Sequence, residues 1–231
     1  MRAVTSCGTF KCRSAARPIV PPSLPVSATV VRPTDFANPI ASSTLRDVPL
    51  VEAGALHDRV RRGDVRPVVE AAAAIVASLK NGGKLLIFGN GGSATDAQHT
   101  AAELVGRFQR ERVALAAIAL SADTSVLTAI GNDESYERVF ARQIEALGRK
   151  GDVALGISTS GLSPNIIWAL ETAKERGLRT IGLTGRDGGH VGKVVEIHVN
   201  VPSESTARVQ EVHRTLIHAM CDLVERAFAD A

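Results

Sequence analysis

The chain has 231 residues, enough for one sizeable domain, and its 45% hydrophobic and 22% charged residues are typical of a globular protein. No run reaches the roughly 18 to 20 apolar residues that cross a bilayer, so no membrane partner is expected. The net charge of +3 arises before residue 51, where six basic residues face two acidic ones. The rest of the chain is close to neutral, which argues against a nucleic-acid partner.

Residues 1–50 are predicted to form a disordered extension. Seven of the ten prolines lie there, and residues 17–39 have neither helical nor strand periodicity. The early arginines and serines also resemble an organelle transit peptide, but an over-extended start site or a dispensable tail is the favoured explanation. The folded domain is therefore predicted over residues 51–231.

The cysteine content indicates a reducing compartment. Cys7, Cys12 and Cys221 are too few for a disulfide framework, and two of them lie in the predicted extension. We therefore expect a cytoplasmic protein.

Helical periodicity alternates with short apolar runs from residue 51 onward. Strands are expected at 84–89, 114–120, 153–158, 179–184 and 195–201. Helices are expected at 66–80, 93–107, 124–130, 136–147 and 164–176, with a long closing helix at 206–229. Because each strand is an apolar run between helices, the predicted fold is α/β, a doubly wound parallel five-stranded sheet flanked by helices.

Ligands of such sheets bind beyond the carboxyl ends of the strands, and a glycine-rich segment follows the first strand. Residues 89–93 read GNGGS and lead directly into a helix. Glycines let backbone N–H groups approach an anion closely, and a helix N-terminus adds free donors. A tight strand-to-helix turn would use the same residues, so this motif alone leaves a structural explanation open.

The loop after the third strand is rich in hydroxyl groups. Four side-chain hydroxyls lie within six positions, from Ser158, Thr159, Ser160 and Ser163, and Pro164 is placed to begin a helix. One serine suffices to cap a helix, so the other hydroxyls favour a neutral cradle for a phosphate monoester.

Two residues of the first loop's helix have the spacing of metal ligands. His99 and Glu103 are four positions apart, which puts an imidazole and a carboxylate on one helix face. Zn²⁺ suits such a mixed nitrogen and oxygen donor set. The closing helix adds Gln210, Glu211, His213 and His218, although a solvated helix can carry such residues without function.

Several motifs together resemble one enzyme family. They are GNGGSATDAQHTAAELVGRF at 89–108, LTAIGND at 127–133, GDVALGISTSGLSPNI at 151–166 and TARVQEVHRTLIH at 206–218. From residue 83 to 228 the chain is similar to the bacterial phosphoheptose isomerases, which have the flavodoxin-like sugar-isomerase (SIS) fold.

The resemblance implies roles for individual residues. Glu103 and His218 would be the catalytic acid and base, and one Zn²⁺ per subunit would be held by His99, Glu103, Gln210 and His218. The substrate would be bound by Asn90, Gly91, Gly92, Ser93, Glu103, Arg107, Asn132, Asp133, Ser158, Thr159, Ser160, Ser163 and Gln210.

The resemblance also implies the reaction and the assembly. The enzyme would convert D-sedoheptulose 7-phosphate to D-glycero-D-manno-heptose 7-phosphate through an enediol, early in the synthesis of ADP-heptose for the lipopolysaccharide core, and would form a homotetramer. Two alternatives remain: an isomerase of another phosphosugar, or a non-catalytic SIS protein that binds a replication initiator or another protein. Such binding proteins lack the full Glu and His set, so Glu103 and His218 favour an enzyme.

The spacing of two implied metal ligands conflicts with a single regular helix. Gln210 and His218 are eight residues apart, which corresponds to about 12 Å along a helix. Either the helix is distorted, or His218 belongs to a site built mainly by a neighbouring chain. We therefore expect Glu103 and His218 to act from different subunits, with His213 as the competing ligand in the same chain.

Overall fold

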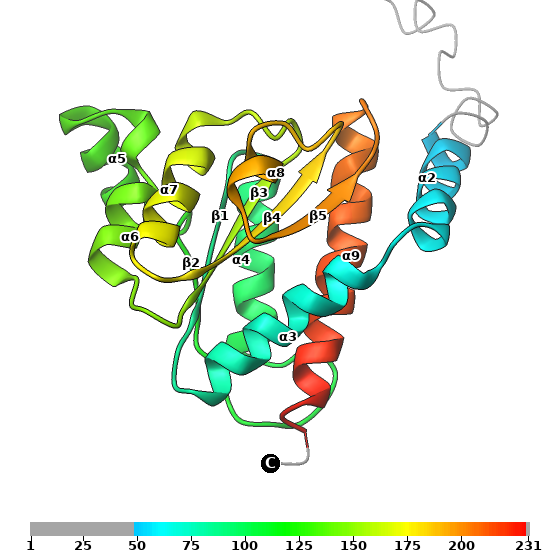
Figure 1. Cartoon of the computed structure of the whole chain (residues 1–231), viewed down its shortest axis with the longest axis horizontal. Helices are drawn as coiled ribbons and strands as arrows, with labels where there is room; N and C mark the ends of the chain where they lie inside the picture. The colour runs from blue at the N-terminus through cyan, green and yellow to red at the C-terminus, as the bar shows by residue number, and fades with distance from the viewer. Residues whose placement is uncertain (1–48, 230–231) are drawn as a thin grey trace, which may run out of the picture. The chain divides into compact units, whose positions relative to one another are not determined.

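The computed structural model describes residues 49–229 as alternating strands and helices (Figure 1). Residues 1–48 lie outside the described part, so the predicted disorder of the extension and its boundary with the domain stay predictions.

The sheet has five parallel strands in the order β2-β1-β3-β4-β5. The strands are β1 (Leu85–Gly89), β2 (Ala117–Ala119), β3 (Val153–Ser158), β4 (Arg179–Gly185) and β5 (Ile197–Val201). This flavodoxin-like order confirms the predicted doubly wound sheet. The chain reverses its direction of winding between β1 and β3, so the loops after these two strands flank the crevice where such folds bind ligands.

Helices cover both faces of the sheet. In chain order they are α2 (Val51–Arg62), α3 (Arg66–Lys80), α4 (Gly92–Val105), α5 (Thr124–Asp133), the 3₁₀ turn η3 (Tyr136–Arg138), α6 (Ala141–Leu147), α7 (Pro164–Glu175), α8 (Val191–Val194) and α9 (Thr206–Arg226). Buried residues of α3, α4 and α9 form one core cluster with the sheet, and those of α6, α7 and α8 form another.

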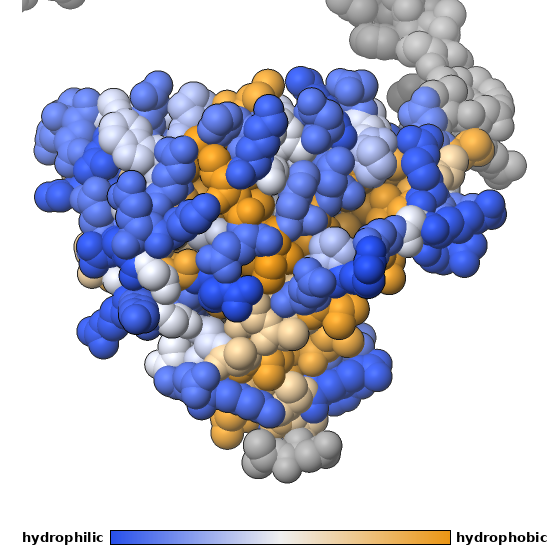
Figure 2. Space-filling model, viewed as in Figure 1, coloured by the Kyte–Doolittle hydropathy of each residue, from blue (hydrophilic) through white to orange (hydrophobic). Residues whose placement is uncertain are grey.

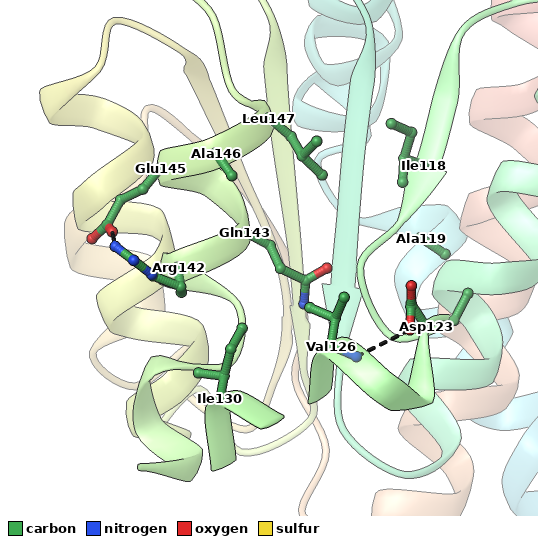
Figure 3. Close-up of a pocket in the computed structure, with 11 residues that line it drawn as sticks. Ile118, Ala119, Asp123, Val126, Ile130, Arg142, Gln143, Glu145, Ala146 and Leu147 are labelled. Carbon is green, nitrogen blue, oxygen red and sulfur yellow. Dashed lines mark hydrogen bonds and ion pairs between the residues drawn. The ribbon is translucent and has the colours of Figure 1, made fainter. Parts of the chain in front are cut away.

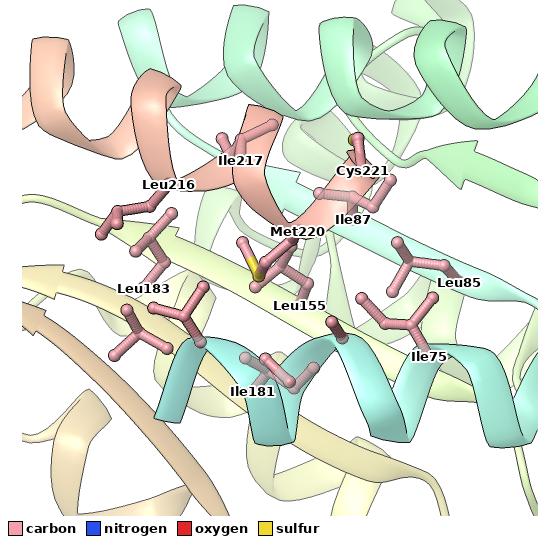
Figure 4. Packing of buried hydrophobic residues seen from close by; sticks show 14 of the residues in the cluster. Ile75, Leu85, Ile87, Leu155, Ile181, Leu183, Leu216, Ile217, Met220 and Cys221 are labelled. Atoms are coloured by element: carbon pink, nitrogen blue, oxygen red, sulfur yellow. The ribbon is translucent and has the colours of Figure 1, made fainter. Parts of the chain in front are cut away.

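Successive residues of strand β1 face opposite clusters. Leu85 and Ile87 pack with α3, α4 and α9 (Figure 4), whereas Leu86 and Phe88 pack on the other face. Because side chains alternate along a strand, a strand covered on both faces must be apolar at every position. This explains the continuous apolar run of β1.

The ends of the helices follow local sequence signals. Pro67 and Pro164 lie in the first turns of α3 and α7, where the missing N–H costs nothing. The hydroxyl of Ser205 accepts the N–H of Arg208 and caps α9. Gly82, with φ of 76°, turns the chain from α3 towards β1.

Four elements differ from the predictions. The second strand is shorter, because the N–H of Leu115 bonds to the carbonyl of Leu104 rather than to β1. The helix predicted at 136–147 is split where Val139 and Phe140 enter the core. The short α8 and the amphipathic α2 were not predicted. α2 buries only Leu56 and packs against α9.

Among residues 49–229, no helix is both long and apolar enough to cross a membrane.

Candidate active site

The glycine loop after β1 is held by a pair of amides. Gly91, with φ of 55°, precedes α4 in a conformation that favours glycine. The side chains of Asn90 and Asn165 exchange two hydrogen bonds of 2.9 Å, and the hydroxyl of Tyr136 donates to the Asn90 Oδ1 at 3.3 Å. These contacts tie the glycine loop to the start of α7.

The hydroxyl loop after β3 is folded on its own side chains. The Ser158 Oγ lies 3.1 Å from the Ser163 Oγ and accepts the N–H of Gly161 at the same distance. The Ser160 Oγ accepts the N–H of Leu162 at 3.2 Å. These bonds fix the hydroxyls at the start of α7.

The two loops line a common cavity of about 250 Å³. Its walls are Asn90, Gly91, Gly92, Ser93, Ile157, Ser158, Thr159, Ser163, Thr206 and Gln210. None of these lining residues is charged, but the N-termini of α4 and α7 lie beside the cavity. Helix N-termini carry free N–H donors and partial positive charge, so the cavity suits an anion.

Three side chains predicted as metal ligands converge further along α4. The His99 Nε2 lies 2.9 Å from the Glu103 Oε1 and 3.1 Å from the Nε2 of His218 on α9. One donor atom from each residue lies within 4.8 Å of the other two. The aromatic ring of Phe108 lies 5.3 Å from that of His218, between centroids. The three donors are half-buried and open to a ligand.

A buried thiol lies behind this cluster. Burial, together with the negative charges of Glu103 and Glu225, raises the pKa of Cys221 to about 12. The Cys221 side chain therefore stays a neutral thiol and belongs to the core.

Gln210 is not brought to the three converging side chains. Its amide lies against the glycine loop, since a Cβ added at Gly92 would be 2.4 Å from the Gln210 Nε2. The expectation that His218 needs a neighbouring chain to meet Glu103 is wrong, because both residues meet within one chain. Gln210, two turns earlier on the unbroken helix α9, is the residue that stays apart. Its role as a metal ligand stays a prediction.

His213, the alternative ligand, lies in the core. Its side chain is fully buried, and its Nε2 donates to the carbonyl of Thr184 at 2.9 Å. Its Nδ1 is buried without a hydrogen-bond partner. Burial lowers the pKa of His213 despite the hydrogen bond to Thr184, so the ring is neutral. His213 therefore neither replaces His218 nor supports it directly.

We expect His213 to make the fold sensitive to mild acid. A histidine whose pKa is lowered by folding stabilises the protein above its unfolded pKa of about 6.5, and this contribution is lost as the pH falls below that value. His213→Gln, which stays neutral and can still donate, should flatten the fall in unfolding free energy below pH 6.5. Chemical denaturation across that range checks this, with the exposed His190→Gln as control. Parallel curves for His213→Gln and wild type would contradict it.

Five predicted substrate residues do not line the cavity, namely Glu103, Arg107, Asn132, Asp133 and Ser160. Arg107 is exposed and pairs with Glu111 at 2.5 Å. Asn132 and Asp133 are exposed at the end of α5, where the Asn132 amide donates to the Asp133 Oδ1 at 2.8 Å. Their binding roles stay predictions.

The structure adds two residues that the sequence did not indicate. Asn165 and Tyr136 both bond to Asn90. Asn165 lies in the stretch that resembles the family, but an asparagine after the first proline of a helix gives no signal of its own.

A larger cavity of about 710 Å³ lies at the edge strand β2, between α5 and α6 (Figure 3). Its walls are mostly apolar, with Ile118, Val126, Ile130 and Leu147 among them. None of the predicted site residues lines this cavity. The converging polar groups of the two loops and of α4 therefore form the candidate site.

Comparisons with known proteins assign the family. The SIS domain model matches residues 50–185. A phosphoheptose isomerase from Citrifermentans bemidjiense is 57% identical over 166 residues, which cover 71% of this chain and 86% of the relative. The chain belongs to the phosphoheptose isomerase family.

Other relatives and solved structures agree with this assignment. A phosphoheptose isomerase of Neisseria meningitidis is 55% identical over 70% of this chain and 83% of its own length. The structure of one from Neisseria gonorrhoeae superposes with a TM-score of 0.76 at 46% identity, covering 80% of this chain and all of that one. One from Francisella tularensis gives 0.77 at 35% identity, covering 81% and 100%. The resemblance, the SIS fold and the enzyme class are thereby confirmed.

Proposed function

We propose that this chain converts D-sedoheptulose 7-phosphate to D-glycero-D-manno-heptose 7-phosphate. The observation that carries the proposal is the meeting of His99, Glu103 and His218 on the two helices, α4 and α9, that also contribute to the uncharged cavity. Membership in the phosphoheptose isomerases supports the reaction class.

The hydroxyl loop is proposed to bind the phosphate end of the sugar. Ser158, Thr159, Ser160 and Ser163 offer neutral donors, and the start of α7 offers backbone N–H groups. Neutral donors at a helix N-terminus stabilise a dianion without a compensating cation. The glycine loop, with Asn90 and Gln210, is proposed to contact the hydroxyls of the sugar chain.

Glu103 and His218 are proposed to carry the protons. Isomerisation removes a proton from C1 of the ketose, passes through an enediol, and returns a proton to C2 while the carbonyl moves to C1. One group must take the proton from C1 and return a proton to C2, and another must protonate the C2 carbonyl oxygen and accept the proton of the C1 hydroxyl. The imidazole of His218 lies beside the Glu103 and His99 pair, so an acid and a base are available within one site.

The same three side chains fit a zinc ion. Ligand atoms about 2.0 to 2.1 Å from a tetrahedral ion are about 3.3 Å apart, close to the 2.9 and 3.1 Å between these donors. We propose that His99, Glu103 and His218 hold one Zn²⁺ per subunit, with Gln210 as the remaining predicted ligand. When bound, the ion would polarise the sugar carbonyl or its hydroxyl groups.

Removal of the metal should abolish most of the activity. Dialysis against a strong chelator is expected to lower turnover, and equimolar Zn²⁺ should restore it. Metal analysis of the purified protein should find about one zinc per chain, and His99→Ala should lower this content. Full activity in a protein shown to be metal-free would contradict the zinc proposal.

The reaction itself is tested by incubating the purified protein with sedoheptulose 7-phosphate and separating ketose from aldose phosphates. Formation of the heptose 7-phosphate supports the proposal. Turnover of fructose 6-phosphate or another phosphosugar alone would identify a different substrate. Failure to convert any phosphosugar would favour a binding protein with the SIS fold.

We propose that the protein works as a cytoplasmic homotetramer early in ADP-heptose and lipopolysaccharide core synthesis. Four valines and leucines of the α2 and α3 region are exposed, namely Leu50, Val51, Val65 and Val69, at 67, 61, 46 and 53%. Figure 2 shows hydrophobic residues at the surface over α3 and α9. Exposed apolar surface of this kind supports self-association. Light scattering of the purified protein measures the assembly.

A further inference from the structure

A buried ion pair lies beyond the end of α4. Arg112, in the segment between α4 and β2, places its Nε 3.5 Å from the Oε1 of Glu225 in the last turn of α9. Both side chains are 0% exposed. Neither can therefore touch a substrate, and their effect must pass through the groups that they hold.

The Arg112 guanidinium caps the carboxyl end of α4. Its Nη2 donates to the carbonyl of Glu103 at 2.7 Å, and its Nη1 donates to those of Leu104 at 2.8 Å and Gly106 at 2.9 Å. The last carbonyls of a helix lack partners within the helix, and a cation is favourable there. Arg112 thus fixes the backbone of Glu103 itself.

Glu225 holds the segment that follows α4. Its carboxylate accepts the backbone N–H groups of Phe108, Gln109 and Arg110 at 2.8 to 2.9 Å. Burial acts to raise the pKa of Glu225, but these three donors and Arg112 outweigh it, so the pKa lies below its ordinary value. A charged Glu225 thereby holds Phe108, whose ring lies against His218.

We propose that Arg112 and Glu225 are positioning residues that fix Glu103 and His218 relative to each other. Arg112 acts on Glu103 through its carbonyl, and Glu225 acts on His218 through Phe108. The inference rests on the proposed roles of Glu103 and His218 as proton carriers and metal ligands. Small displacements of such groups cost much activity, because the reacting atoms must be aligned.

The test is Arg112→Lys, which keeps the charge beside Glu225 but puts a single nitrogen in place of the two Nη atoms that bond separately to Glu103 and to Leu104 and Gly106. We expect kcat for sedoheptulose 7-phosphate to fall at least about tenfold, and Zn²⁺ affinity, measured by chelator competition, to fall about 10-fold to 100-fold. The KM and the inhibition constant of inorganic phosphate should stay within about twofold, because the hydroxyl loop does not contact the pair.

The matched control is Arg176→Lys at the end of α7, whose guanidinium likewise donates to a backbone carbonyl, that of Gly148 at 3.4 Å. This variant should keep kcat and zinc affinity. If Arg112→Lys does not fold, Glu225→Gln takes its place, because glutamine preserves the shape of the glutamate side chain. The same losses of kcat and zinc affinity are expected.

The outcomes separate the two proposals. A wild type without isomerase activity refutes the proposed reaction, while a loss of zinc affinity in Arg112→Lys still supports positioning. An active wild type whose folded variant keeps both kcat and zinc affinity refutes positioning. An equal loss of kcat, zinc affinity and phosphate binding would also overturn it, since general loosening explains such a result.

Discussion

Glu103→Gln and His218→Asn are each expected to lower kcat by about 100-fold or more, because each removes a proton carrier. Glutamine and asparagine keep much of the shape of the original side chains, so the core around α4 and α9 should stay packed. Initial rates with sedoheptulose 7-phosphate, on variants shown to be folded by circular dichroism, measure the effect.

Glu103→Gln and His218→Asn should lower turnover without disturbing the phosphate site. The inhibition constant of inorganic phosphate should change little, because the hydroxyl loop lies after β3 and neither residue lines its cavity. Glu171→Gln and His190→Asn make the same chemical changes at exposed positions and serve as controls. Near-normal turnover in folded Glu103→Gln or His218→Asn would assign that residue to structure rather than to proton transfer.

Much of the fold could be predicted because the sheet is covered on both faces. Strands β1, β3 and β4 are buried along nearly their whole length, so each appears as an apolar run between helices. Edge strand β2 gave a weaker signal, because the apolar residues before it turn away from the sheet to meet the end of α4. Helix α2 buries a single residue, Leu56, so its sequence is mostly polar and was not predicted as a helix.

Part of the site was also visible in the sequence. His99 and Glu103 share one helix, so their spacing alone places them together. His218 comes from α9, and its meeting with His99 depends on how α4 and α9 pack. The sequence distance between Gln210 and His218 argued against a common position on one regular helix, but it did not say which of the two lies with Glu103.

Residues that act through the backbone gave no signal at all. Arg112 and Glu225 are charged residues in a segment between elements and in a helix end, positions that are normally solvated. Their burial becomes evident only when the end of α4, the following loop and the last turn of α9 are seen together. A backbone carbonyl accepts a hydrogen bond whatever the side chain of its residue, so the sequence gives no sign of such a bond.

Gly161→Ala is expected to disrupt the hydroxyl loop. Gly161 has φ of 66°, and an added Cβ would lie 2.2 Å from the carbonyl oxygen of Gly188. That oxygen belongs to the backbone, so the loop after β3 or the loop after β4 must move. Because Ser158 bonds to the N–H of Gly161, the movement reaches the hydroxyls of the proposed phosphate site. We expect KM for sedoheptulose 7-phosphate to rise at least about tenfold, as hydrogen bonds to a charged group are lost.

Conformational strain alone should not raise KM, and Gly151→Ala is the control for strain. Gly151 has φ of 93°, but an added Cβ would meet no atom within 4 Å. Its substitution should cost about 1 to 2 kcal/mol of unfolding free energy and leave KM unchanged. Gly161→Ala carries a similar strain and, in addition, the collision with Gly188. Only this variant should therefore weaken the binding of both the sugar phosphate and inorganic phosphate. Equal KM values for the two folded variants would mean that the phosphate does not bind at the hydroxyl loop.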